Sequence, residues 1–357
     1  MKLLFALPGF HRYDRGAEVA LLSVASELAR AEDEITVLGS GEPRPQAPYV
    51  YHSLPSIRRE WFEAFPKFPP LRSETAWEDA TFAANLVLRE PLSTYDATIT
   101  CSFPFTHWAL RRGRGSGPAH IFVTQNGDWP AFSDRFEYRF FGCEGLVCTN
   151  PDYLSRNRQR WRCALIPNGV DINRFQPGPS SRERFGLPSG KPVVLMVSAF
   201  IESKRVLDGI RAIAEIDDVF LAVAGDGPLR QEARKLADEL LRGRFCQLTL
   251  PAQDMPDLYR SADAFLHLSL LESFGNVFLE AWASSLPIVA HDSERLRWIL
   301  GDGQFLCDTE DRTALVSSVT ASLTAGKSAA PQGIERFTWP AIARQYRDFV
   351  AEVLAAA

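Results

Sequence analysis

Short apolar runs alternate with amphipathic stretches along most of the chain. Leu3–Leu7 is an uninterrupted apolar run, and Ala17–Ala31 follows it with apolar residues at helical spacing. Such short apolar runs are typical of strands buried on both faces of a parallel sheet, and the helical spacing is typical of helices that cover a sheet. The chain is therefore predicted to have an α/β fold built from βαβ units.

The same alternation continues through both halves of the chain. In the first half we predict further strands at Glu34–Leu38, Ala97–Cys101, Ile121–Thr124 and Leu146–Thr149. In the second half we predict strands and helices in turn, at Val193–Ser198, Val206–Ile216, Val219–Ala224, Leu229–Leu241, Phe245–Leu250, Asp257–Ser261 and Ala264–Leu268. Two series of this kind predict two parallel sheets, each covered by helices.

A stretch with the composition of a turn and linker separates the two series. Pro167-Asn168-Gly169 has turn chemistry, and Gln176–Ser181 is rich in proline, glycine and serine. We predict a Rossmann-like N-terminal domain over residues 1–164 and a Rossmann-like C-terminal domain over residues 165–340. Because parallel sheets bind ligands at the carboxyl ends of their strands, the predicted site is a central cleft that the two domains face.

Composition narrows the classes of protein to which the chain belongs. The chain has 357 residues and a net charge of −5, which suits two domains and argues against nucleic acid as a partner. Its longest apolar runs, such as Pro192–Phe200, are shorter than the ~18 residues that a membrane span needs. The six cysteines lack the spacing of metal ligands, so we expect reduced thiols and a cytoplasmic protein.

The stretch Arg58–Arg72 departs from the general pattern. It interleaves Trp61, Phe62, Phe65 and Phe68 with arginines, a lysine and several prolines. We expect a long aromatic loop or a broken helix. Peripheral contact with a membrane, contact with an acceptor, and packing under the edge of a domain all remain open for this stretch.

The segment Leu271–Ala283 carries the clearest chemistry. A strand is predicted to end near Leu268 and a helix to begin near Gly275, so the helix presents backbone N–H groups at its positive end, where a diphosphate binds well. Glu272 and Glu280 flank this point, about 12 Å apart along a continuous helix. Carboxylates at that separation suit the sugar hydroxyls and the ribose hydroxyls of a nucleotide diphosphate-sugar. The plain alternative is a pair of surface glutamates on an amphipathic helix.

Three further segments are candidate phosphate sites. Gly225-Asp226-Gly227 follows a predicted strand, and glycine allows close approach of the backbone to a ligand. Lys204 follows another strand and is able to neutralise charge on a departing diphosphate. Arg15-Gly16 lies between the first strand and the first helix. Each of these segments taken alone is equally consistent with an ordinary turn or a solvated cation.

Together these motifs resemble the retaining glycosyltransferases of family 4, which have the GT-B fold, over nearly the whole chain. The matching pieces stand in the family's order: Gly16-Ala17-Glu18, Ile166–Asp171, Lys204, Gly225–Pro228, Glu272, Glu280 and Phe337-Thr338-Trp339. The set is specific, although no single motif is. The resemblance also implies that the last helix, within residues 341–357, crosses back to the N-terminal domain.

The resemblance implies a role for each matching residue. Glu280 would hold the ribose, and Glu272 the donor sugar. Lys204 and backbone amides would hold the diphosphate, and Gly16 would close on it from the N-terminal domain. The complete predicted donor-binding set is Gly16, Gly225, Asp226, Gly227, Phe274, Gly275, Asn276, Val277 and Glu280. The catalytic set is Glu272, Lys204 and Arg15.

Departures from the family pattern affect the leaving-group and sugar contacts. Ala199 stands where the family commonly has an arginine, so we expect Arg15 to supply the missing cation. Gln125 and Asn126 stand where the family commonly has a histidine near the sugar. Together with His11 they are the predicted acceptor- and sugar-side residues. The stretch Ser285-Leu286-Pro287 also replaces a common glycine before its proline.

The predicted activity is transfer of a sugar from a nucleotide diphosphate-sugar to an acceptor hydroxyl with retention of anomeric configuration. The acceptor is a carbohydrate, a lipid-linked molecule or a small molecule. No Asp-x-Asp clamp follows a predicted strand, and the family is usually metal-independent, so we expect no metal and no cofactor. A nucleotide-sugar epimerase and an inactive nucleotide-sugar-binding homologue remain as alternatives. A nicotinamide dehydrogenase does not fit, because Pro8-Gly9-Phe10-His11 lacks the glycine pattern of its first turn.

Overall fold

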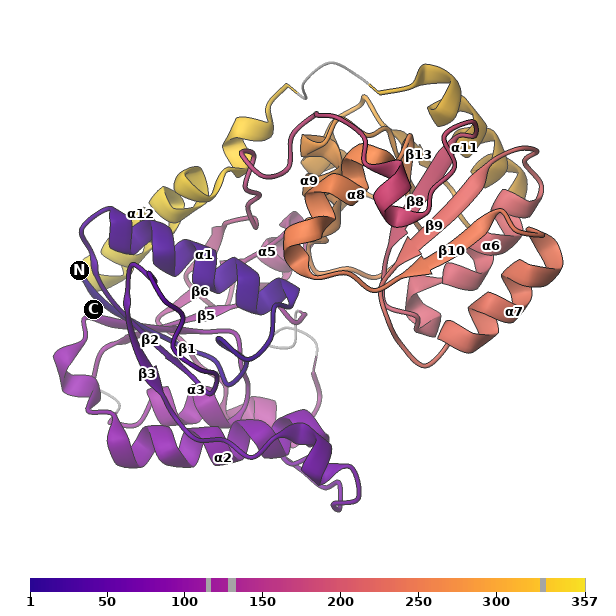
Figure 1. Ribbon diagram of the computed structural model, residues 1–357. Helices are drawn as coiled ribbons and strands as arrows, with labels where there is room; N and C mark the ends of the chain where they lie inside the picture. Colours follow the sequence, from indigo (N-terminus) through magenta and orange to yellow (C-terminus); the bar gives the residue numbers. More distant parts are fainter. Residues whose placement is uncertain (114–116, 128–132, 328–331, 357) are drawn as a thin grey trace. The chain divides into compact units, whose positions relative to one another are not determined.

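The computed structural model describes the chain except residues 114–116, 128–132, 328–331 and 357. The chain divides into two compact units (Figure 1). The N-terminal unit contains Met1–Gly169 together with Trp339–Ala357, and the C-terminal unit contains Val170–Thr338. Both units are parallel sheets covered by helices, so the predicted α/β fold with two Rossmann-like domains is confirmed.

The N-terminal unit is built on a sheet with the strand order β3-β2-β1-β4-β5-β6-β7 in the described part of the chain. Its strands are β1 (Lys2–Ala6), β2 (Glu34–Gly39), β3 (Val50–Ser53), β4 (Ala97–Thr100), β5 (Ala119–Val123), β6 (Gly145–Cys148) and β7 (Cys163–Leu165). Its α-helices are α1 (Gly16–Arg30), α2 (Glu74–Arg89), α3 (Phe105–Leu110), α5 (Pro151–Asn157) and α12 (Trp339–Ala355). The strands β1, β4 and β6 are almost wholly buried, as their apolar sequences require.

Helix α12 joins the N-terminal unit although it ends the chain. It packs beside α1 on one face of the sheet, where the two helices share a single hydrophobic core (Figure 1). The approach to the sheet is close at Gly145 in β6, where an added Cβ would lie 2.8 Å from a methyl group of Val353. The glycine therefore makes room for the last helix. The other face of the sheet is covered by α2 and α3 around Phe82 and Leu86.

The C-terminal unit has the strand order β10-β9-β8-β11-β12-β13 in the described residues. Its strands are β8 (Val193–Val197), β9 (Phe220–Ala224), β10 (Phe245–Leu248), β11 (Ala264–His267), β12 (Ile288–His291) and β13 (Phe305–Cys307). Its α-helices are α6 (Val206–Ala214), α7 (Arg230–Leu240), α8 (Met255–Ser261), α9 (Asn276–Ala283), α10 (Glu294–Leu300) and α11 (Arg312–Ala325). Separate hydrophobic cores fill the two faces of this sheet.

The aromatic stretch Arg58–Arg72 forms one short 3-10 turn, η1 (Arg59–Phe62), followed by a loop. All six cysteines are free, as expected. None of the helices in the described ranges is long and apolar enough to cross a membrane.

Candidate active site

The connection between β11 and α9 positions the central groups of the site. Gly275 precedes the helix with a φ of 89°, a conformation that glycine adopts readily. An added Cβ there would lie 2.6 Å from the ring of Phe278, so both the backbone angle and the space require glycine. The helix thus begins at Asn276, next to the predicted position. Its first-turn N–H groups give this end of the helix a partial positive charge.

Glu272 lies in this connection and meets a lysine from another element. The Lys204 ammonium forms an ion pair with Oε1 of Glu272, and both side chains are partly buried. Lys204 ends the 3-10 turn η5 (Glu202–Lys204), which follows β8. The structure therefore brings together two of the three predicted catalytic side chains, which are 68 residues apart in sequence.

Two further residues complete the cluster around Glu272, and neither belongs to the predicted site. Nε2 of His267, at the end of β11, lies 3.5 Å from the same carboxylate oxygen. Burial lowers the pKa of His267 to about 4, so its imidazole is neutral at pH 7. Arg295, in the first turn of α10, donates a hydrogen bond from Nη1 to the backbone carbonyl of Glu272. At neutral pH the cluster holds two cations and one carboxylate, an arrangement suited to an anionic ligand.

Glu280 lies one turn inside α9 and is held by a tyrosine. The hydroxyl of Tyr259, on α8, donates a hydrogen bond of 2.8 Å to Oε2 of Glu280. Burial raises the pKa of Glu280, and the fully buried Tyr259 has its own pKa raised by the same cause. One carboxylate oxygen is thus fixed by the protein, which orients the group for hydroxyl ligands.

The glycine loop after β9 has a structural explanation. Gly225 and Gly227 have φ values of 151° and 154°. An added Cβ at Gly225 would lie 2.0 Å from the carbonyl oxygen of Ser198. An added Cβ at Gly227 would lie 2.7 Å from the carbonyl oxygen of Phe200. The glycines therefore allow this loop to pack against the chain that leaves β8, and the Asp226 side chain accepts a hydrogen bond from the Gly227 amide.

Known proteins of similar fold and sequence identify the architecture. Sucrose-phosphate synthase from Thermosynechococcus elongatus superimposes with a TM-score of 0.80 at 19% identity over all of both chains. Anabaena HepE, solved with UDP and glucose, superimposes with a TM-score of 0.74 at 20% identity over 98% of this chain and 99% of the other. The protein has the GT-B fold.

The family match of this GT-B protein lies within its C-terminal unit. Residues 179–333 match the family model "Glycosyl transferases group 1". The lipopolysaccharide core biosynthesis glycosyltransferase LpsD of Rhizobium meliloti is 30% identical over 198 residues, 54% of this chain and 56% of LpsD. A GDP-mannose-dependent mannosyltransferase of Mycolicibacterium smegmatis, acting on phosphatidylinositol monomannoside, is 31% identical over 193 residues, 49% of this chain and 50% of the relative. The chain thus spans about half the length of the curated relatives it matches.

Ala199, which we predicted to stand where the resembling family commonly has an arginine, is exposed after β8. The neighbouring cation Arg205 is committed elsewhere. Its guanidinium donates to the hydroxyl and the carbonyl of Thr309, at 3.0 and 2.9 Å. Arg295, on α10, instead reaches the connection between β11 and α9, where it binds the carbonyl of Glu272. No sequence motif marks this arginine, because it reaches the site only through the order of the strands.

The N-terminal unit of the GT-B fold contains the remaining predicted residues. Arg15 precedes α1, and its guanidinium lies 3.9 Å from the ring centroid of Tyr13. Gly16 is the first residue of α1, at the carboxyl end of β1. Contact of these two residues with a donor stays a prediction.

The acceptor-side candidates have partners within the N-terminal unit. His11 Nε2 lies 2.8 Å from the Tyr49 hydroxyl, and the imidazole stacks on Tyr51. Gln125 exchanges two amide hydrogen bonds with Asn168, so its side chain holds the segment at which the chain leaves the N-terminal unit. The Asn126 side chain approaches the carbonyl of Cys101 at 3.5 Å. The rest of that predicted loop, Asp128 and Trp129, lies outside the described residues.

The described residues contain no cluster of three or more histidine, cysteine, aspartate or glutamate side chains suited to hold a metal ion.

Proposed function

We propose that this protein is a retaining glycosyltransferase of the family 4 type, which transfers a sugar from a nucleotide diphosphate-sugar to an acceptor hydroxyl. The observation that carries the proposal is the ion pair between Lys204 and Glu272 at the start of α9. It places a cation, a carboxylate and a positive helix end at one point. A diphosphate-linked sugar needs these three groups together.

The donor lies, in this proposal, along the start of α9. Its diphosphate faces the amides of residues 274–277 and the ammonium of Lys204. The donor sugar hydroxyls donate to Glu272, and the ribose hydroxyls donate to the free oxygen of Glu280. Since Tyr259 already holds the other oxygen of Glu280, the carboxylate loses little freedom when the ribose binds.

Transfer breaks the bond between the anomeric carbon and the diphosphate oxygen and forms a bond from that carbon to the acceptor oxygen. The acceptor proton passes to the departing diphosphate, on the face of the sugar from which it leaves. Lys204 and the helix end stabilise the negative charge that develops there, which is electrostatic catalysis without a metal ion. Metal independence is part of the proposal.

The acceptor is, we propose, a carbohydrate or a lipid-linked carbohydrate. The relatives named above act in lipopolysaccharide core biosynthesis and on a phosphatidylinositol monomannoside, according to their names. This choice rests on similarity over about half of the chain.

A donor screen tests the proposal. We expect one of UDP-, GDP-, ADP- and dTDP-sugars at saturating concentration to raise the melting temperature, because a ligand of the native state stabilises it. The same donor should be turned over after exhaustive treatment with EDTA, with its nucleoside diphosphate released when acceptor is present. Absence of both stabilisation and turnover with all four donors contradicts the proposal. Turnover that EDTA abolishes and manganese restores contradicts its metal-independent part.

A further inference from the structure

Helix α2 packs Phe82 and Leu86 against the sheet in the ordinary way, but it also buries two carboxylates and exposes large apolar side chains. Its two central carboxylates, Glu78 and Asp79, are each 2% exposed, whereas Leu88 is 81% exposed and Val87 is 47% exposed. A surface helix usually turns its apolar stripe to the core and its charges to water. The outer side of α2 from Trp77 to Leu88 is uncharged and mostly apolar, interrupted by Thr81 and Asn85, and exposed apolar side chains gathered on one side of a helix indicate an interaction surface.

Both buried carboxylates of α2 have polar partners within the N-terminal unit. Glu78 forms ion pairs with Arg12 and Arg59, at 2.9 and 3.1 Å. Asp79 accepts hydrogen bonds from the hydroxyls of Ser102 and Thr106 and from two backbone amides at the start of α3. Polar bonding thus fixes the inner side of α2, and its outer side carries no charged residue between Asp79 and Arg89.

The loop after η1 extends the same apolar surface. Phe62, Phe65 and Phe68 surround Trp77 of α2, with ring centroids 5.5 to 6.0 Å from it. Trp61, in η1 itself, is 77% exposed. Phe65 and Phe68 contact Trp77 and still remain about half exposed, so the aromatic stretch packs on α2 and also presents apolar rings to solvent.

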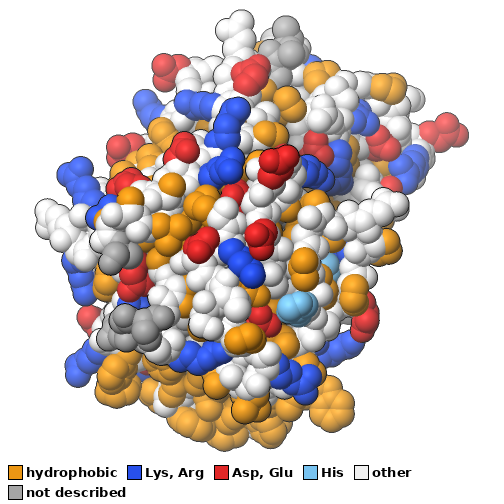
Figure 2. Space-filling model, turned by 90° about the vertical axis from the view of Figure 1, so that its left-hand side faces the viewer, with side chains coloured by type: hydrophobic (Ala, Val, Ile, Leu, Met, Phe, Trp, Pro, Cys, Tyr) orange, Lys and Arg blue, Asp and Glu red, His pale blue; other side chains and the backbone are white. Residues whose placement is uncertain are grey.

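A second aromatic segment adjoins this loop. It is the 3-10 turn η3 (Phe136–Phe140), and Arg72 at the end of the loop pairs with its Glu137 through two hydrogen bonds of 2.6 and 3.1 Å. Phe136 and Phe140 are both 56% exposed. Figure 2 shows hydrophobic side chains gathered at the lower end of the molecule, at the level of α2 in Figure 1.

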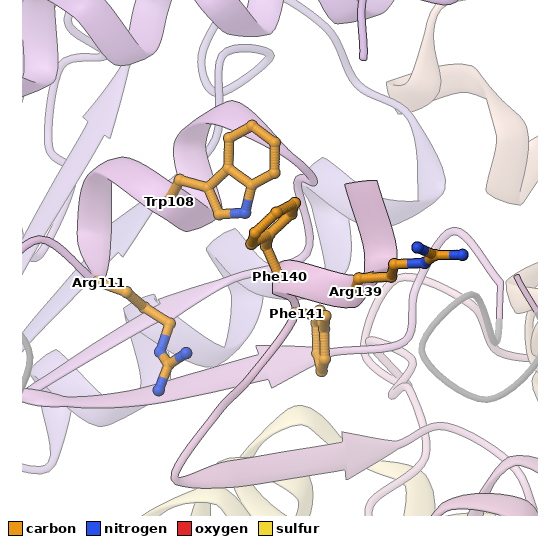
Figure 3. Close-up of a pocket in the computed structure, with 5 residues that line it drawn as sticks. All are labelled: Trp108, Arg111, Arg139, Phe140 and Phe141. Atoms are coloured by element: carbon orange, nitrogen blue, oxygen red, sulfur yellow. The ribbon is translucent and has the colours of Figure 1, made fainter. Parts of the chain in front are cut away.

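A pocket of about 250 Å³ opens beside η3. Its lining residues are Trp108, Arg111, Arg139, Phe140 and Phe141 (Figure 3). The rings of Trp108 and Phe140 meet edge to face, 6.4 Å between centroids. Arg139 is exposed on η3 and points away from these rings, so the pocket combines an aromatic wall with a guanidinium at its rim. That combination suits an anionic group joined to an apolar body.

We propose that this surface docks the protein on an anionic phospholipid membrane. We call it the aromatic face and define it by Trp61, Phe65, Phe68, Leu88, Phe136 and Phe140. Exposed arginines border it at positions 58, 89, 135 and 139, against three exposed acids, Glu60, Glu63 and Asp134. Aromatic and leucine side chains enter the boundary between headgroups and acyl chains, while arginines bind the lipid phosphates.

The charge of the border distinguishes a membrane from a second copy of the chain. In a two-fold dimer through the aromatic face, the same arginine border would meet itself, and like charges in an interface are unfavourable. An anionic bilayer complements the border even though the whole chain carries a net charge of −5. The proposal does not depend on the donor or on turnover, so it stands or falls separately from the proposed function.

Vesicle flotation with the full-length chain tests this proposal. We expect binding to vesicles of phosphatidylcholine with about one third phosphatidylglycerol, and much weaker binding to phosphatidylcholine alone. Leu88→Glu should weaken binding to the anionic vesicles about tenfold or more, since it removes an apolar side chain that the bilayer would bury. Arg139→Glu should weaken it at least about fivefold, the contribution of one basic residue near an anionic surface.

Matched variants in the C-terminal unit are the controls. Leu240→Glu and Arg234→Glu make the same changes at exposed positions of α7 and should bind vesicles as the unchanged chain does. Gel filtration of the unchanged chain and of Leu88→Glu should give the same monomeric elution. A dimer that Leu88→Glu dissociates would overturn the proposal in favour of self-association. Absence of binding to anionic vesicles, or equal loss in the control variants, would also overturn it.

Discussion

The two units place their charged side chains in opposite ways. At the start of α9, in the C-terminal unit, Lys204, Glu272 and Arg295 gather in a partly buried cluster at the ends of strands. On α2, in the N-terminal unit, Glu78 and Asp79 are buried and paired, and the outer side exposes the large apolar side chains of Val87 and Leu88. The first arrangement suits a small anionic ligand, and the second suits an extended surface.

The difference shows how a site and a docking surface are encoded. Glu272 and Gly275 stand between the end of a strand and the start of a helix, and this pattern can be recognised within a few residues of sequence. The apolar surface depends on which side of a helix faces the sheet, and buried partners far away in the sequence decide that.

The largest expected effect in this comparison is at Lys204. Lys204→Ala should lower kcat about ten- to a hundredfold, because it removes a cation needed as charge develops on the diphosphate, about 1.5–3 kcal/mol. Arg205→Ala is the matched control, since that guanidinium is bound to Thr309, and its kcat should change little. Steady-state kinetics on both variants decides the assignment. A large effect at position 205 with none at position 204 would reverse it.

Arg295 and Arg15 are the two candidates for the cation that the family resemblance leads us to expect at position 199. Arg295→Ala should lower kcat about tenfold through loss of a hydrogen bond from a charged group to the Glu272 loop, with a smaller change in KM. Arg295→Lys should restore part of the rate, because the charge remains. Arg15→Ala should lower kcat to a similar degree if the N-terminal unit supplies the cation. A silent Arg295→Ala together with a slow Arg15→Ala would assign the role to Arg15.

Glu272→Gln should affect turnover more than nucleotide binding. The carboxylate is proposed to face the sugar, so the free nucleoside diphosphate should bind the variant with an affinity within about threefold of the original, while kcat falls about tenfold or more. Calorimetry and initial rates on the same preparation measure both. Equal losses in affinity and in rate would place Glu272 on the nucleotide instead.

The smallest expected effect concerns stability and compares one buried histidine from each unit. Burial lowers the pKa of His120 to about 3 and that of His267 to about 4. The unfolded chain binds a proton below pH ~6.5 that the folded chain does not, so each histidine contributes stability above that pH and loses it as the pH falls, by about 1.4 kcal/mol per pH unit. His267→Gln should therefore flatten the fall in unfolding free energy between pH 6 and 4.5. An equal slope in His267→Gln and in the unchanged chain would contradict the buried-neutral assignment.

Much of the fold was predictable because buried strands are continuous apolar runs. The ranges predicted for the strands of residues 3–7, 193–198 and 264–268 agree with β1, β8 and β11 to within one residue at either end. The short edge strands β3 and β13 were missed, since Val50–Ser53 is largely exposed and Phe305–Cys307 has only three residues. The strands β7 and β12 and the helices α2, α3, α5, α10 and α11 were missed as well.

The candidate site was predictable where its residues follow a strand directly. Lys204, Glu272 and Gly275 fall into this class. His267 ends β11 and Arg295 follows β12, but no local motif marks either residue, so only the fold shows that both meet Glu272. Gly225 and Gly227 stay predicted donor contacts, and close packing against the chain after β8 gives a structural reason for both glycines.

The most direct test of the account is calorimetric titration of the nucleoside diphosphate, chosen by the donor screen, into the unchanged chain and into Glu280→Ala. The account predicts that Glu280→Ala weakens binding by about 1.5–3 kcal/mol, because the ribose hydroxyls lose hydrogen bonds to a charged group. Glu232→Ala, an exposed glutamate on α7, should bind as the unchanged chain does. Unchanged affinity in Glu280→Ala, in a variant whose thermal unfolding remains cooperative, would contradict the placement of the donor along α9.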